Sequence, residues 1–94
     1  MELRMNGTVL TGRLVGDPKT LRTGTYFQLR AEDEQSPFPC VCDGLTAKNL
    51  VANCHEGDEI SLEGRLEWRR FASGSMLLVY ARFISYGRKA RTLV

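Results

Sequence analysis

The stretch that most constrains this chain is NGTVLTGRLVGDP, residues 6–18, because it alternates like a β-strand and yet contains three glycines. The alternation predicts a strand from about Leu3 to Val15, longer than the usual strand of about 5–6 residues. A strand of that length must bend inside a small domain, and an interior glycine permits a bulge or a close backbone crossing. We therefore expect Gly12 to mark the corner of a closed barrel, with Pro18 beyond the strand's end because proline cannot donate to a ladder.

Four further segments alternate in the same way, at 24–33, 38–44, 58–70 and 76–86, with a hairpin loop at 71–75. Gly64 in the fourth segment predicts a second bend, and Pro39 indicates an edge or the start of the third strand. Alternation predicts that the following side chains face the core: Phe27, Leu29, Ala31, Ile60, Leu62, Leu66, Trp68, Leu77, Val79, Ala81 and Phe83. It turns Tyr26, Gln28 and Arg30 to the opposite side of the second strand. A stacking platform is the alternative role for Trp68, although its parity favours packing in the core, and Tyr80 and Tyr86 are left undecided between the same two roles.

One helix is predicted between the third and fourth strands, in LTAKNLVANCHEGDE. Its apolar stripe is Ala47, Leu50, Val51 and Cys54, and Gly57 is expected to end it in the left-handed conformation. Five strands, bent in the first and fourth, with a helix between the third and fourth, predict an all-β OB-fold, a five-stranded Greek-key barrel. We expect one domain over residues 1–87 and a flexible basic tail over 88–94.

Charge is distributed unevenly along the chain although the net charge is only +2. The balance is +3 over residues 1–30, −7 over 31–64 and +6 over 65–94, and ten of the thirteen basic residues are arginine. Such polarity favours one face suited to a polyanion, unless the fold interleaves the segments. Arginine also pairs with phosphates and stacks on bases.

Several classes of protein are disfavoured. No apolar run approaches the roughly 20 residues that span a bilayer, and MELRMNG lacks the apolar core of a signal peptide, so we expect a cytoplasmic protein. The single histidine has no recognisable nucleophile or carboxylate partner and no glycine-rich phosphate loop is present, so we expect neither an enzyme nor a cofactor.

The three cysteines lack a disulfide-framework spacing and fit a reducing compartment. A metal site built from Cys40, Cys42, Cys54 and His55 is the alternative, but the usual zinc spacings are absent. Buried, inert thiols are the favoured interpretation.

Three stretches together resemble the bacterial single-stranded DNA-binding proteins and their relatives, including the small primosomal replication OB proteins. NGTVLTGRLVGDP is similar to the family's opening pattern, with its apolar spacing displaced by a residue. DGLTAKNL followed by HEGDEISLEGRLEWRR is similar to the family's helix and fourth strand, and RFASGS stands where the family has an aromatic residue in a hairpin. The likeness covers roughly residues 5–86.

The resemblance implies binding of single-stranded DNA with little sequence preference, and assembly into homodimers or homotetramers through the first strands. By this likeness Phe71 is the hairpin aromatic, and Arg69 and Arg70 are the basic residues before it. Reasoning from the residues adds Tyr26, Arg30 and Arg82, which would supply stacking or phosphate neutralisation. RNA remains an alternative ligand, since nothing in the sequence discriminates a 2′-hydroxyl.

The sequence also departs from the family. Pro37 or Phe38 stands where the family has a tryptophan, Asp43 lies near its third-strand aromatic, and the acidic tail that recruits repair partners is absent. These departures support a second hypothesis, an OB-fold module for assembly or protein contacts that has lost nucleic-acid binding.

Overall fold

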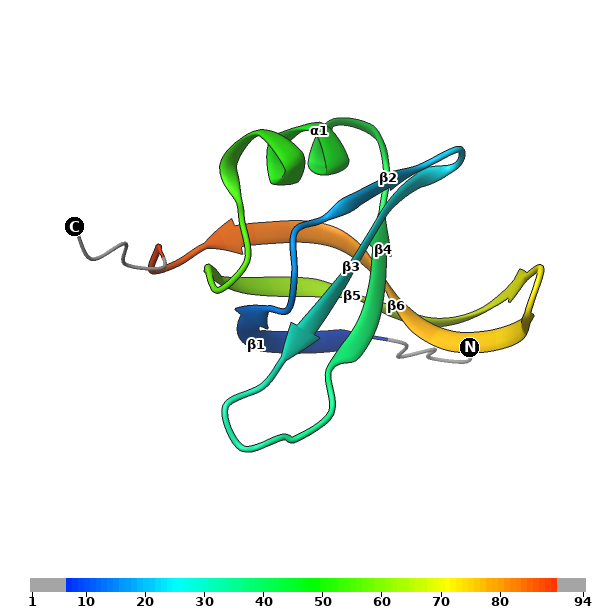
Figure 1. The fold of residues 1–94 in the computed structure, drawn as a ribbon, viewed down its shortest axis with the longest axis horizontal. Helices are drawn as coiled ribbons and strands as arrows, with labels where there is room; N and C mark the ends of the chain where they lie inside the picture. Colours follow the sequence, from blue (N-terminus) through cyan, green and yellow to red (C-terminus); the bar gives the residue numbers. More distant parts are fainter. Residues whose placement is uncertain (1–6, 90–94) are drawn as a thin grey trace, which may run out of the picture.

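The computed structural model describes residues 7–89, which form one curved sheet closed into a barrel with a single helix across one end (Figure 1). In chain order the elements are β1 (Thr8–Leu14), β2 (Lys19–Leu21), β3 (Gly24–Arg30), β4 (Phe38–Cys42), α1 (Gly44–Asn53), β5 (Glu59–Phe71) and β6 (Gly74–Tyr86). The predicted start of the first strand at Leu3, and residues 90–94 of the predicted tail, lie outside the described residues.

The strand order is β1-β5-β6-β4-β3-β2, and an additional antiparallel pairing of β1 with β3 closes the barrel. β4 and β6 pair in parallel, whereas the other neighbours are antiparallel. The predicted all-β OB-fold barrel, with its helix between the third and fourth barrel strands, is confirmed. The one addition is β2, a three-residue strand that pairs with the start of β3 and lies outside the closed ring.

Glycine permits close backbone crossings at two points of the barrel. Gly12 lies where β1 passes from β5 to β3, and a Cβ there would sit 2.3 Å from the carbonyl oxygen of Arg30. At Gly64 a Cβ would sit 1.9 Å from the carbonyl oxygen of Tyr80, beside a bulge in the β5–β6 ladder. The two predicted bends therefore coincide with positions that no larger residue can occupy without backbone movement.

The core fills the barrel beneath α1. Its buried residues include Phe27, Leu29, Ile60, Leu62, Val79 and Ala81, together with Leu50 and Ala47 from the helix. Val51 was also predicted for the apolar stripe, but it is 43% exposed. The helix ends at Asn53, before Gly57, which instead takes its left-handed φ of 88° in the turn that leads into β5.

Four predicted core residues are exposed: Trp68 at 70%, Phe83 at 66%, Leu66 at 41% and Leu77 at 38%. Beyond Gly64, β5 and β6 continue past the barrel as a ribbon, here called the hairpin arm (residues 65–77), which projects to the right in Figure 1. Among residues 7–89, the core cluster does not extend beneath the side of the arm that continues the core face, which accounts for the exposure of Leu66 and Trp68. Leu77 pairs with Trp68 across the ladder and shares its exposure.

Phe83 is exposed for a different reason. Glu63 pairs with Phe83 and Gly64 pairs with Ala81, so Arg82 is an extra residue without a partner on β5. This bulge reverses the alternation of β6, which turns Phe83 outward and brings Ile84 against the core. A single inserted residue inverts the facing of every side chain beyond it.

None of the helices in the described part of the chain is long and apolar enough to cross a membrane.

Candidate nucleic-acid interface

A row of outward-facing side chains crosses four strands of the barrel. Register pairs Tyr26 of β3 with Val41 of β4, Val41 with Tyr80 of β6, and Tyr80 with Arg65 of β5. Side chains at directly paired positions share one face of a sheet and lie within contact range. The row therefore places two half-exposed tyrosines on either side of a buried valine, with a guanidinium at one end.

Tyr80 is the centre of this face because two arginines approach its ring. The guanidinium carbon of Arg65 lies 5.3 Å from the ring centroid, and that of Arg69 lies 6.0 Å away. Both distances are within the range of a cation–π interaction. The ring is thus an aromatic surface with two cations beside it, which is the combination that stacked bases and phosphates require.

Glu67 holds the same two arginines. Its carboxylate oxygens lie 3.1 Å from Arg65 Nε and 3.0 Å from Arg69 Nε, so the acid bridges both guanidinium groups. Partial burial raises the pKa of Glu67, but the hydrogen bonds and charges of Arg69 and Arg65 outweigh it and leave the pKa below its usual value. Glu67 is therefore ionised at neutral pH and cancels one of the two positive charges beside Tyr80.

Asp43 adds a second negative charge to this face. The hydroxyl of Tyr80 donates a hydrogen bond to Asp43 Oδ1 at 2.8 Å, and this bond, followed by burial and the charge of Asp43, raises the pKa of Tyr80. We call the group formed by Arg65, Glu67, Arg69, Tyr80 and Asp43 the tyrosine cluster. With two cations and two anions, the tyrosine cluster carries no net charge.

Three of the six predicted site residues lie on one face of the sheet. Tyr26 lies in the outward row, Arg69 belongs to the tyrosine cluster, and Phe71 lies at the end of β5 on the same side of the arm as Arg69. Arg70 points to the opposite side of the arm, because successive residues of a strand face opposite ways. Arg69 and Arg70 therefore lie on opposite sides of the arm.

The other two predicted residues lie elsewhere. Arg82 is the bulge residue of β6, and its carbonyl oxygen accepts a hydrogen bond from Thr46 Oγ1 of the helix at 3.3 Å. Arg30 pairs with Arg13 at the far end of β3, roughly 13 Å along the strand from Tyr26. Neither side chain joins the tyrosine cluster.

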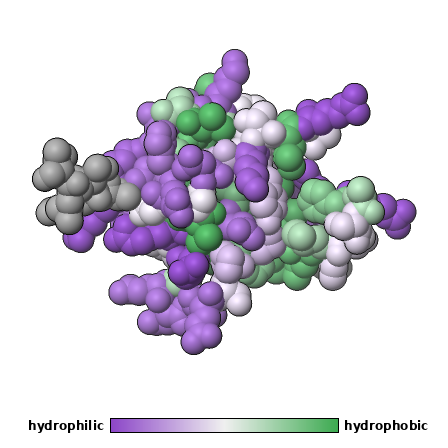
Figure 2. Space-filling model, in the orientation of Figure 1, coloured by the Kyte–Doolittle hydropathy of each residue, from purple (hydrophilic) through white to green (hydrophobic). Residues whose placement is uncertain are grey.

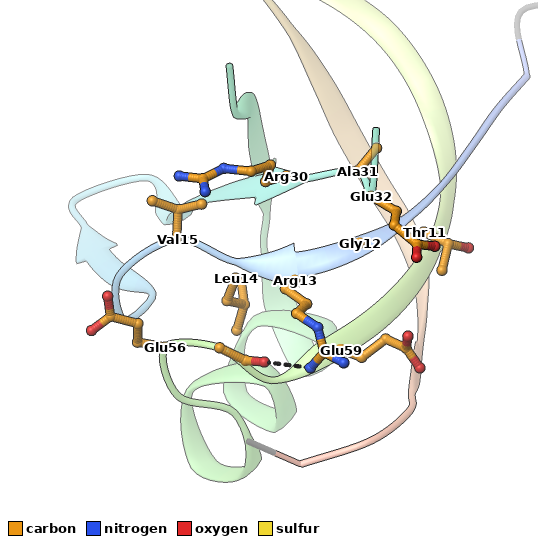
Figure 3. A pocket seen from close by; sticks show the side chains of 11 residues that line it. Thr11, Gly12, Arg13, Leu14, Val15, Arg30, Ala31, Glu32, Glu56 and Glu59 are labelled. Carbon is orange, nitrogen blue, oxygen red and sulfur yellow. Dashed lines mark hydrogen bonds between the residues drawn. The ribbon is translucent and has the colours of Figure 1, made fainter. Parts of the chain in front are cut away.

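Arg30 and Arg13 instead line a surface cavity of about 540 Å³ between β1, β3 and the turn before β5 (Figure 3). Arg13 donates a hydrogen bond to the carbonyl oxygen of Gly57 at 3.0 Å. The guanidinium of Arg30 is directed away from that carbonyl group (Figure 3). The cavity also has three acidic lining residues, Glu32, Glu56 and Glu59. Negative charges from residues 31–64 therefore lie here beside positive charges from residues 1–30.

Sequence reasoning missed Arg65 and left Tyr80 undecided. Arg65 could have been found from the strand alternation, because it shares its parity with Arg69 and Phe71 in GRLEWRRF. Tyr80 could not, because its place beside Arg65 and Val41 depends on strand register.

All three cysteines are free and buried. Burial raises the pKa of Cys40 and that of Cys42 to about 12. A smaller contribution in the same direction comes from the negative charge of the ionised Cys42 thiol at Cys40, and from Asp43 at Cys42. Burial also raises the pKa of Cys54, while His55 is exposed. Within residues 7–89 no group of histidine, cysteine and acidic side chains is arranged to hold a metal ion.

Comparison with known proteins gives a structural match without a sequence match. No protein-family model and no curated protein matches the chain. Among solved structures, the SSB domain of a protein from Synechococcus sp. superposes with a TM-score of 0.73 at 20% sequence identity, over 92% of this chain and the whole of that one. The chain thus shares the OB-fold of this SSB domain.

Proposed function

We propose that this protein binds single-stranded DNA without sequence specificity, as a component of DNA replication, recombination or repair. The observation that carries the proposal is the approach of Arg65 and Arg69 to the half-exposed ring of Tyr80. Non-specific binding of single strands combines cations along the backbone with aromatic rings on which bases stack, and each stacked base contributes about 1–3 kcal/mol.

The outward row defines the path that we propose for the strand. Tyr26 and Tyr80 offer rings on either side of Val41, and Phe71 offers a third ring farther along the arm. None of these rings reads the hydrogen-bonding edge of a base, which fits binding that tolerates any sequence. The structural likeness to the SSB domain from Synechococcus sp. supports the same proposal.

We further propose that two or more copies assemble through β1. Residues Thr8–Gly12 pair with β5 on one side, while the described β1–β3 pairing covers only Arg13 and Leu14. Two outward side chains beside this edge are large and apolar: Val9 and Phe83 flank Glu63 in register and are 75% and 66% exposed. A partly open strand edge beside an apolar surface favours pairing with a second copy. The setting would be the cytoplasm, in association with the nucleoid and with other replication or repair proteins.

A second function, an OB-fold module for protein contacts, is favoured by the tyrosine cluster's lack of net charge. Glu67 and Asp43 occupy hydrogen-bonding positions beside the rings, where each repels a phosphate. The two hypotheses differ in one measurable respect, because only the first requires affinity for a single strand.

The deciding experiment is fluorescence anisotropy of a labelled oligo-dT titrated with the protein at about 50 and 200 mM salt, with duplex DNA and oligo-rU of equal length beside it. We expect salt-sensitive binding of the single strand in preference to duplex, and the oligo-rU titration distinguishes DNA from RNA as the ligand. Absence of binding at low salt, from a folded sample, would favour the protein-contact module.

Two variants locate the binding on the proposed face. Phe71→Ala should weaken binding without unfolding the protein, and Arg69→Gln should lower the salt dependence by about 0.7 in the slope of log K against log salt. Arg88→Gln is the matched control for charge, since this arginine follows β6 at the end away from the arm. Equal effects of Arg69→Gln and Arg88→Gln would place the strand elsewhere.

A further inference from the structure

The hairpin arm has a second side that the proposed path does not use. The exposed residues on this side are Leu66, Trp68 and Arg70 from β5, and Ser75 and Leu77 from β6. Trp68 is the most exposed large hydrophobic residue of the arm at 70%, and its cross-strand partner Leu77 is 38% exposed. Figure 2 shows apolar and weakly polar surface gathered on the side of the molecule from which the arm projects.

Among the described residues, the second side of the arm carries positive charge and no negative charge. Arg70 is its one ionisable residue, two positions from Trp68 and therefore on the same face, and among residues 7–89 it makes no ion pair. The tyrosine cluster, in contrast, holds its two arginines against Glu67. An indole ring beside an unneutralised guanidinium suits a base and its phosphate better than it suits an apolar protein surface.

The two sides are close enough to serve one strand. The arm is a single ribbon of two strands, and Phe71 on the first side lies three residues from Trp68 on the second, about 10 Å along β5. Past Phe71 the chain turns through Ala72 and Ser73 into Gly74, so the end of the arm is narrow. A nucleic acid that follows the first side to Phe71 can thus continue around the arm.

We propose that Trp68 and Arg70 form a second contact surface for single-stranded DNA, with a base stacked on the indole and a phosphate paired with the guanidinium, so that one strand wraps around the arm. This inference rests on the proposed function and extends it to a surface on the opposite side from the tyrosine cluster.

Trp68 is the only tryptophan of the chain, so its fluorescence reports directly on this surface. OB-folds bind about 4–16 nucleotides, so an oligo-dT of about 20 nucleotides can reach both sides of the arm and one of about 5 can reach only one. The long oligonucleotide should quench Trp68 at the concentrations at which anisotropy shows binding. The short one, bound at the tyrosine cluster, should quench it far less.

Two variants test the surface by affinity. Trp68→Leu keeps an apolar side chain but removes the ring, and it should raise the Kd for the long oligonucleotide by about 5- to 30-fold with less than a twofold effect on the short one. Arg70→Gln should lower the salt slope for the long oligonucleotide by about 0.7. Because Trp68 is exposed, Trp68→Leu should leave the melting temperature within about 2 °C of the wild type.

Three results would overturn the inference. The first is binding of the long oligonucleotide with no change in Trp68 fluorescence and unchanged Kd for both variants, which would leave the proposed function standing. The second is a change of oligomeric state in Trp68→Leu by analytical ultracentrifugation, which would make this surface a contact between copies. The third is absence of binding by the wild type to either oligonucleotide, which would reject the proposed function together with the inference.

Discussion

The hydroxyl of Tyr80 donates a hydrogen bond of 2.8 Å to Asp43 Oδ1, which joins the outward row of the barrel to the residue that precedes α1. Asp43 is the N-cap residue of α1, yet its side chain makes no capping hydrogen bond. Its carboxylate is engaged with the phenol instead. An acid that could stabilise the helix start is thus placed beside the ring on which we propose that a base stacks.

Asp43→Asn should tighten binding of single-stranded DNA. The amide oxygen of asparagine can still accept the hydrogen bond from Tyr80, while the charge that repels phosphate is removed. We expect the Kd at low salt to fall by about 2- to 5-fold, a modest gain because exposed charges are screened. The measurement is anisotropy with labelled oligo-dT.

Tyr80→Phe is the matched control for this change, because it removes the hydrogen bond that Asp43→Asn can retain, while it keeps both the ring and the charge of Asp43. Its Kd should stay within about twofold of the wild type while its stability falls by about 0.5–1.5 kcal/mol. If Asp43→Asn weakens binding, the acid contributes to the interface and does not oppose it.

Glu67→Gln should also strengthen binding, because the wild-type carboxylate occupies both guanidinium groups at 3.0 and 3.1 Å. Phosphates compete with that carboxylate, so its removal should lower the Kd by about 3- to 10-fold and steepen the salt dependence. Glu63→Gln makes an equal change in net charge on the β1–β5–β6 surface, where Glu63 lies between Val9 and Phe83. Equal gains from both variants would mean that only net charge matters, and the tyrosine cluster would lose its support.

Gly64→Ala should destabilise the fold severely. The added Cβ would sit 1.9 Å from the carbonyl oxygen of Tyr80, so the β5–β6 ladder must shift. Overpacking costs about 1–3 kcal/mol, and a clash with backbone belongs at or above the upper end of that range. Gly7→Ala is the control, since nothing lies within 4 Å of its Cβ position. Urea unfolding of both variants is the measurement, and a loss below about 1 kcal/mol at Gly64 would contradict the crossing.

Stability should fall in alkaline solution because the thiols of Cys40 and Cys42 ionise more readily in the unfolded chain than in the folded one. Their pKa values of about 12 in the folded protein exceed the ordinary 9.0, so above pH 9 the unfolded chain has lost protons that the folded chain retains. Each thiol therefore removes up to about 1.4 kcal/mol of unfolding free energy per pH unit between pH 9 and 12. Urea unfolding at a series of pH values measures this slope.

Cys42→Ala should be less stable at pH 7 because of the cavity it leaves, but its stability should decline less steeply above pH 9. An unchanged slope would mean that other groups cause the alkaline loss.

Much of the fold could be predicted from local pattern. Alternation correctly placed Phe27 and Leu29 in the core. Gly12 and Gly64 correctly predicted the two close backbone crossings, because a glycine inside a strand indicates a bend or a close approach of another backbone. Of the predicted site residues, Arg69 and Phe71 lie together because they share the parity of one strand. Arg70 was assigned to the same surface although parity alone excludes it.

Alternation by itself determined which side chains share a face, but only the tertiary structure decided what that face meets. Trp68 lies on the same face of β5 as the buried Ile60 and Leu62, yet it is exposed because β5 extends beyond the barrel. Phe83 changed sides because an unpaired residue at Arg82 inverts the parity of β6. Tyr80 met Arg65, Arg69 and Asp43 through pairings between segments far apart in sequence. Such meetings depend on register and barrel closure, which are properties of the whole chain and not of any one stretch.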